Sequence, residues 1–150
     1  MLFGLLLALA PVGAAAQRQP VQAATSIPDQ TGIARLVWST MAAVDHANKT
    51  GNYMVLRSLG SPAFQAANSV SALATVFASV RQTDLSATLS VEPVYEFPPR
   101  LEAGQLRIRG AFRMRPEAVQ FDLVYQWNQG SMLQAIAVRA VPASTLPPTR

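Results

Sequence analysis

LRIRGAFRMR, the sequence of residues 106–115, alternates apolar side chains with arginines. This alternation is typical of an antiparallel strand with one face buried and the other face in water. The apolar face would carry Leu106, Ile108, Phe112 and Met114, and the wet face would carry Arg107, Arg109, Arg113 and Arg115. Gly110 lies in the middle, where a sheet commonly bends or another backbone comes close. We therefore expect a curved antiparallel sheet that includes this strand.

Further strands are expected on both sides of this segment, because the chain reads with period two from Leu85 onward. The strand before it contains Pro93, which lacks the N–H that a ladder needs, so we expect this strand to be an edge strand or to carry a bulge. The expected strands are residues 89–97, 106–114, 119–127 and 132–141, with a tight turn at residues 128–130.

The preceding part of the chain has the period of amphipathic helices instead. Asp29 or Thr31 can cap the first helix and Asn52 the second, and Gly51 lies where the first should stop. The expected helices are residues 33–49, 53–59 and about 69–80. Helices followed by strands indicate the α+β class. The expected fold is three N-terminal helices packed on a curved antiparallel sheet of about four strands.

The composition limits the function classes. The 150 residues suffice for one domain with a real core. The absence of cysteine excludes thiolate metal sites, thiol catalysis and lipid attachment through a thiol. Nothing in the pattern predicts a metal site or a cofactor. The net charge of +4 comes almost entirely from arginine, and it suits an anionic partner or simply an arginine-rich composition.

The N-terminus has the pattern of an export signal. A leucine-rich apolar run at residues 2–13 is followed by three alanines, which predicts cleavage after Ala16 and a mature protein that begins at Gln17. The run is too short to span a bilayer, so we expect no stable membrane span after processing and a periplasmic or secreted protein. No Lys or Arg precedes the run, which departs from the usual pattern. Residues 17–29 are expected to form a flexible leader and residues 142–150 a disordered, proline-rich tail.

The turn between the first two expected helices carries a resemblance to a known family. Residues 50–53 read TGNY, residues 56–59 continue a helix, and residues 61–64 read SPAF. Over residues 30–141 the chain resembles the nuclear transport factor 2-like superfamily, with Asn52 where aspartate is usual. The resemblance implies a cone whose cavity lies between helices and sheet and serves as an isomerase or dehydratase site, as a ligand pocket, or is filled. It also implies a homodimer through the sheet and an exported bacterial member.

The inward-facing aromatic residues are the candidate lining of such a cavity. They form either an ordinary core or an apolar pocket for a small hydrophobic ligand, with the hydroxyls of Tyr53 and Tyr125 as its polar contacts. The set comprises Trp38, Tyr53, Phe77, Tyr95, Phe112, Phe121, Tyr125 and Trp127.

The arginines of residues 107–115, joined by Arg139, form the second candidate site. They can pair across strands with Glu92, Glu96 and Asp122 on a solvated face. Alternatively they form a homodimer surface or bind an anionic polymer or headgroup. Nucleic acid is not expected as a partner, since an exported protein seldom meets it and no aromatic residues interleave with these arginines.

Catalytic chemistry has little support in the pattern. Asp45 and His46 are adjacent, so on a helix they point about 100° apart and read as a solvated pair rather than an acid–base pair. The carboxylates at 92, 96 and 122 have the phase of the outer face, where ionised groups belong. We therefore predict a non-catalytic module that binds a small apolar ligand or a protein. The alternatives are a lyase or isomerase using Tyr53 and a carboxylate, and a structural homodimer with a filled core.

Overall fold

The first helix forms as its sequence predicts. The computed structural model describes residues 26–128 and 130–146. In it, α1 (Gln30–Thr50) begins where the Asp29 carboxylate accepts a hydrogen bond from the Gly32 N–H at 2.7 Å. It ends at Gly51, whose φ of 71° is the left-handed conformation that glycine adopts most easily. Its apolar stripe is buried against the sheet.

Three shorter helices follow, one more than expected at this point in the chain. They are α2 (Met54–Ser58), α3 (Pro62–Ala67) and α4 (Val70–Val76), and α4 continues as the 3₁₀ turn η1 (Phe77–Val80). The second expected helix ended at Leu59, and no helix was expected to start at Ser61-Pro62. The pair instead starts α3, because Ser61 accepts a hydrogen bond from the Phe64 N–H and proline suits the first helical position.

The strand expected to begin at Leu89 begins later. Residues Leu85–Ser90 form the 3₁₀ turn η2, in which Leu85 and Thr88 are buried. Buried residues three apart lie on one side of a 3₁₀ turn, so the apparent period of two was misleading here. The Asp84 carboxylate caps this turn by accepting from the Ser86 N–H.

The sheet has five antiparallel strands among the described residues rather than about four. β1 and β2 both pair with one edge of β3, and the order continues through β4 to β5. The short β2 was missed because its hairpin turn has positive φ at Ala103 and Gly104 without the usual asparagine or aspartate. The strands are β1 (Pro93–Tyr95), β2 (Arg100–Glu102), β3 (Gln105–Phe112), β4 (Glu117–Gln126) and β5 (Met132–Pro142).

Two special residues lie where the sequence placed them. Pro93 is in the edge strand β1, as expected for a residue without an N–H. Gly110 permits a close approach of β1 to β3, because a Cβ at this position would lie 2.4 Å from the Val94 carbonyl oxygen. The contact is closer than real Cβ atoms show, so the pairing of β1 requires glycine here.

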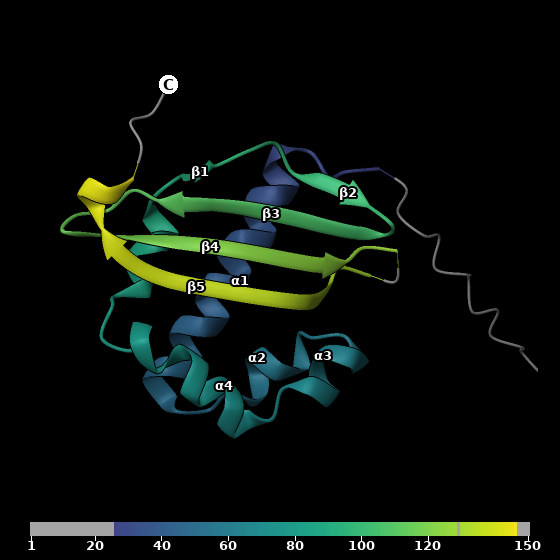
Figure 1. The fold of residues 1–150 in the computed structure, drawn as a ribbon, viewed down its shortest axis with the longest axis horizontal. Helices are drawn as coiled ribbons and strands as arrows, with labels where there is room; N and C mark the ends of the chain where they lie inside the picture. The colour runs from purple at the N-terminus through teal and green to yellow at the C-terminus, as the bar shows by residue number, and fades with distance from the viewer. Residues whose placement is uncertain (1–25, 129, 147–150) are drawn as a thin grey trace, which may run out of the picture.

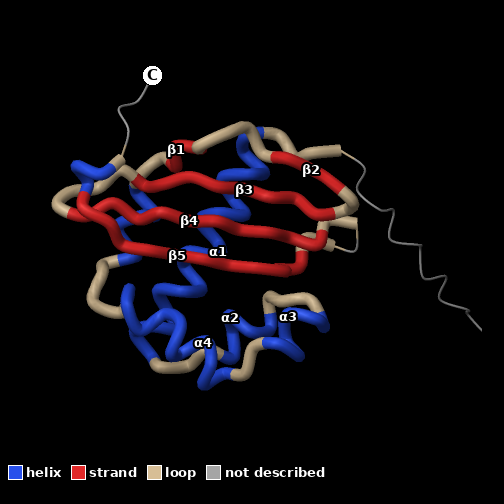
Figure 2. The backbone as a smooth tube through the Cα atoms, in the orientation of Figure 1, coloured by secondary structure: helices blue, strands red, loops and turns tan. Residues whose placement is uncertain are grey.

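The elements form one sheet with helices on one side (Figures 1 and 2). α1 crosses behind the sheet, and α2, α3 and α4 lie beyond the β5 edge. The connection between α2 and α3 pairs with the start of β5, because Leu133 bonds through its N–H to Leu59 and through its carbonyl oxygen to Ser61. No described element covers the near face of the sheet in Figure 1. The α+β class is therefore confirmed.

Both ends of the domain are more ordered than expected. The carbonyl oxygen of Ser26, in the expected leader, accepts a hydrogen bond from Trp127 Nε1 at 3.0 Å. At the other end, Pro142 belongs to β5 and Ala143–Thr145 form the 3₁₀ turn η3, because the Ala143 N–H bonds to the Pro116 carbonyl oxygen. The predicted signal peptide, leader residues 17–25 and tail residues 147–150 lie outside the described residues. No helix in the described ranges is both long and apolar enough to span a membrane.

Candidate functional site

The uncovered side of the sheet is formed by alternate residues of β3, β4 and β5, and we call it the open face. Side chains alternate along each strand, so the pairing register determines which of them become neighbours. Three rows of cross-strand partners make up its centre: Arg107, Val124 and Ala135; Arg109, Asp122 and Ala137; and Ala111, Gln120 and Arg139. Arginines therefore occupy two opposite corners of this array, and small or apolar residues occupy the other two.

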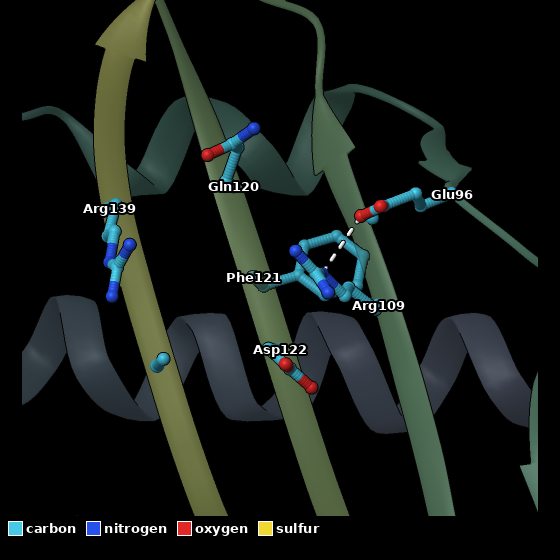
Figure 3. A pocket seen from close by; sticks show the side chains of 8 residues that line it. Glu96, Arg109, Gln120, Phe121, Asp122 and Arg139 are labelled. Carbon is cyan, nitrogen blue, oxygen red and sulfur yellow. Dashed lines mark ion pairs between the residues drawn. The ribbon is translucent and has the colours of Figure 1, made fainter.

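A pocket of about 150 Å³ lies on the open face (Figure 3). Ala137 extends only a methyl group from this face, which leaves room among longer neighbours. Arg109 and Arg139 lie on either side of β4 in this view. The lining residues are Glu96, Arg109, Gly110, Gln120, Phe121, Asp122, Ala137 and Arg139.

Two ion pairs neutralise carboxylates at the pocket. Arg107 donates to both oxygens of Asp122, with distances of 3.0 Å from Nε and 2.6 Å from Nη2. This hydrogen bonding raises the pKa of Arg107 above its usual value. Arg109 Nε lies 2.9 Å from a carboxylate oxygen of Glu96. These pairs are substantially exposed, so they order the side chains more than they stabilise the fold.

Arg139 and Gln120 differ from these pairs because both are unengaged. Within residues 26–128 and 130–146, neither side chain makes a hydrogen bond or an ion pair. They are direct cross-strand partners, so they extend from the same face of the sheet within reach of one another. The pocket therefore has a free guanidinium and a free amide side by side on its wall.

The other two arginines of the predicted row lie outside the strand. β3 ends at Phe112, and Arg113 and Arg115 belong to the connection that leads through a cis peptide bond at Pro116 into β4. Arg113 is half-buried and Arg115 is exposed. The open face thus brings together Arg107, Arg109 and Arg139, and the expected row of four does not continue along β3.

The predicted aromatic set lies on the other side of the sheet, in or against the core. Two pairs of rings are in contact: Tyr53 stacks on Phe77 with centroids 6.4 Å apart, and Phe112 lies tilted against Phe121 at 5.4 Å. The buried members are Tyr53, Phe77, Phe112, Phe121 and Tyr125, and the partly buried members are Trp38, Tyr95 and Trp127. Binding of an apolar ligand among these residues stays a prediction.

The two tyrosine hydroxyls expected to contact such a ligand are bonded to the protein itself. Tyr53 donates to Asn48 Oδ1 at 2.7 Å. The Tyr125 hydroxyl lies 2.7 Å from Thr40 Oγ1 and donates to the Leu36 carbonyl oxygen at 3.1 Å. Burial raises the pKa of Tyr125 to about 12, so it is neutral and a poor general base at physiological pH. Neither hydroxyl is left free for a ligand.

Tyr95 is the exception among the tyrosines. Its hydroxyl oxygen is buried and has no hydrogen-bond partner in the described part of the chain. Burial raises the pKa of Tyr95, and the charge of Glu92 raises it further. A buried donor without a partner is costly, so this hydroxyl marks a place where a bonded water or ligand would be stabilising.

The Asp45–His46 pair does not act as a unit. His46 is exposed, whereas Asp45 is buried and bonds to Lys49 Nζ one helical turn later at 2.8 Å. The expectation that both residues are solvated is therefore wrong for Asp45. This bond with Asp45 is the main reason that the pKa of Lys49 is raised.

Two further arrangements, a Tyr53–carboxylate pair and a metal-binding cluster, are not formed in the described ranges. Tyr53 bonds to Asn48 and accepts from Arg81 at 3.4 Å, so the Tyr53–carboxylate pair of the enzyme alternative is not formed there. Residues 26–128 and 130–146 contain no group of three or more histidine, aspartate or glutamate side chains that could hold a metal ion.

The sequence did not indicate that Gln120, Ala137 and Gly110 would line a pocket. Gln120 has the outward phase of β4, but nothing local indicates that it lies opposite Arg139. Ala137 has the outward phase of β5, yet a small residue in a strand is no signal by itself. Gly110 was noted for backbone approach, and nothing local indicated that it would also line the pocket.

No protein-family model, curated protein or solved structure matches this chain.

Proposed function

We propose that this protein is a non-catalytic interaction module that docks an acidic protein segment on its open face. The observation that carries the proposal is the unengaged Arg139–Gln120 pair in a pocket on an uncovered sheet. Arg107 and Arg109 on the same face are each paired with a carboxylate. Arg139 is available for a carboxylate that another molecule supplies.

Charge favours an acidic partner over a second copy of this chain. Arg100, Arg107, Arg109 and Arg139 share the outward side of the sheet with Glu96, Glu102 and Asp122, and the whole chain carries +4. A second copy would bring the same positive excess against itself, whereas an acidic segment would be attracted and steered. The homodimer predicted from the sequence is therefore the alternative occupant of the open face.

The same sequence and fold features bear on the family of the protein and on its cellular compartment. We propose a member of the nuclear transport factor 2-like superfamily, on the support of the α+β class, the order of helices before strands and the turn at residues 50–53. We further propose export, supported by the apolar run that precedes Gln17. In that setting the partner would be an acidic segment of a periplasmic or secreted protein.

A small apolar ligand on the inner side is the second candidate function. The unsatisfied hydroxyl of Tyr95 favours it, because a ligand acceptor there would remove the cost of a buried unpaired donor. Half-buried Trp38, which donates to the Val91 carbonyl oxygen at 3.2 Å, also packs against the core.

Poly-L-glutamate is a suitable probe for the main proposal, because it presents carboxylates without a specific sequence. We expect binding that weakens as salt rises, since the contact is largely electrostatic. Arg139→Gln should weaken it about three- to fivefold, which corresponds to the loss of one exposed charge pair. Arg35→Gln removes the same charge from an exposed position on α1, behind the sheet, and serves as the matched control.

The comparison of Arg139→Gln with Arg35→Gln separates binding at the open face from attraction to the overall charge. Equal weakening by Arg139→Gln and Arg35→Gln would mean that overall charge drives binding, and would contradict docking on the open face. A protein that sediments as a dimer and loses the dimer in Arg139→Gln would assign the face to a second copy instead. Binding to vesicles with anionic headgroups, without binding to poly-L-glutamate, would assign it to a membrane surface.

A further inference from the structure

The pocket on the open face has the chemistry of a carboxylate site. Arginine presents a planar fork of N–H donors that matches the two oxygens of a carboxylate. A side-chain amide adds a further donor, and Gln120 lies directly across the β4–β5 ladder from Arg139. Both groups face solvent from the same wall of the pocket and have no partner within the described residues.

A second cation lies on the far side of β4. Arg109 uses Nε for its ion pair with Glu96. Its two terminal nitrogens make no hydrogen bond within the described part of the chain. Figure 3 places Arg109 and Arg139 on either side of Gln120 and Asp122. An anion between them would meet donors from two strands.

The surrounding carboxylates determine which anion fits. Asp122 and Glu96 are each paired with an arginine, so one negative charge is tolerated. A dianion such as phosphate would add a second charge close to both of them, which is unfavourable. A cation would lie against the unpaired guanidinium of Arg139. With about 150 Å³, the pocket is also smaller than the sites that hold drug-sized ligands, and it suits one small planar group.

We propose that this pocket binds a single carboxylate, with Arg139 as the principal cation, Gln120 as an amide donor and Arg109 as a second cation. The inference rests on the proposed docking of an acidic segment and names the group of that segment which is recognised. The carboxylate is supplied by an aspartate or glutamate side chain or by the C-terminus of the partner.

Two isomeric probes distinguish these sources. N-acetyl-glutamate α-amide carries a side-chain carboxylate, and N-acetyl-glutamine carries a terminal carboxylate with the side-chain amide. N-acetyl-glutamine amide is the neutral control, and inorganic phosphate tests charge selectivity. We expect the carboxylate probes to shift the ¹H–¹⁵N signals of the Gln120 amide and Arg139 Nε, with affinity in the millimolar range (roughly 1 mM, as for one weakly held group). The probe that binds more tightly identifies the source.

Variants make the assignment specific. Arg139→Gln should weaken the binding of the better carboxylate probe about tenfold, because it removes a charge-assisted hydrogen bond. Gln120→Ala should weaken it less, and the control Arg35→Gln should leave it unchanged. These side chains are exposed, so the variants are expected to fold, and the near-UV circular dichroism spectrum checks this.

Three results would overturn the assignment: equal shifts with the neutral control, tighter binding of phosphate than of carboxylate, and unchanged affinity in Arg139→Gln. If poly-L-glutamate still binds to the open face while the small carboxylates do not perturb the pocket, the proposed function stands and the pocket assignment fails. If neither binds, the proposed function fails as well.

Discussion

Tyr125 couples the interior of the molecule to pH through a single hydroxyl. The group is buried under α1, where it bonds to Thr40 and to the Leu36 carbonyl oxygen. Burial disfavours the phenolate and raises the pKa from the ordinary 10.0 to about 12 in the folded protein, while the hydrogen bond from Thr40 opposes this shift. The unfolded chain loses the proton near pH 10, so it binds fewer protons than the folded protein between pH 10 and 12.

The resulting prediction concerns alkaline stability. The folded state holds the Tyr125 proton longer, so the free energy of unfolding is unaffected by this group below pH 10. It should then fall by about 2–3 kcal/mol between pH 10 and pH 12. Tyr125→Phe has no proton to lose there. At pH 7 it should cost about 1 kcal/mol, because Thr40 loses a partner. Urea unfolding of both proteins at pH 7, 10 and 12 measures the difference. Parallel pH dependence of the two proteins would contradict the assigned cause.

At the scale of elements, the edge strand β1 depends on one glycine in β3. β1 has three residues and pairs with β3 at Gly110. The Val94 carbonyl oxygen lies so close to Gly110 that a Cβ on this residue would clash with it. The ladder continues one residue further, where the Glu96 N–H bonds to the Arg109 carbonyl oxygen at 2.9 Å. Glu96 is therefore held beside the pocket by the same close approach that needs glycine.

We predict that Gly110→Ala displaces β1 and lowers the free energy of unfolding by about 1–3 kcal/mol, the usual cost of overpacking. We expect β1 to move because this short edge strand is held more weakly than β4. Hydrogen exchange at the Glu96 amide, next to β1, should therefore accelerate more than exchange in β4. Ala135→Val adds volume at an exposed position in β5 and serves as the control, with little change expected. Unchanged exchange at Glu96 in Gly110→Ala would show that the strand accommodates the methyl group without moving.

For the whole molecule, the arrangement of layers leaves one face of the sheet open. The α-helices lie on one side of the sheet or beyond its β5 edge, so the opposite side has no cover within the described residues (Figure 2). That side is lined by arginines, carboxylates and small residues. It is therefore stable in contact with water and can also bind a charged partner. The interaction surface that we propose is therefore one face of the sheet.

Export is the prediction that belongs to the intact chain. The apolar run and the alanines before Gln17 match the pattern of a cleaved signal. When the full sequence is expressed in a bacterium, we expect the periplasmic fraction to contain a protein whose first residue is Gln17. Intact-mass measurement and N-terminal sequencing of that fraction check this. Replacing Ala14 and Ala16 with bulky residues should block the processing. Cytoplasmic protein that still begins at Met1 would refute export.

Local patterns in the sequence were sufficient for much of the fold. Period and caps located α1 between Asp29 and Gly51, and period two identified β3, β4 and β5 together with the outward phase of Arg107, Arg109 and Asp122. These features depend on neighbours a few residues apart, which the sequence displays directly. Short elements were less predictable, because η2 and β2 are too brief for a period to be distinguished from chance.

The pocket was determined by the tertiary structure alone. Gln120 and Arg139 are 19 positions apart in the sequence, and they become neighbours through the β4–β5 register, which is shifted by a bulge between Val124 and Tyr125. Likewise, no local pattern shows that Arg107 pairs with Asp122 while Arg139 pairs with no carboxylate among the described residues. Phase assigns a residue to a face of a strand, but long-range pairing decides its neighbours. The sequence therefore predicted an arginine-bearing face, and the pairing of distant strands decided which arginine was left free on it.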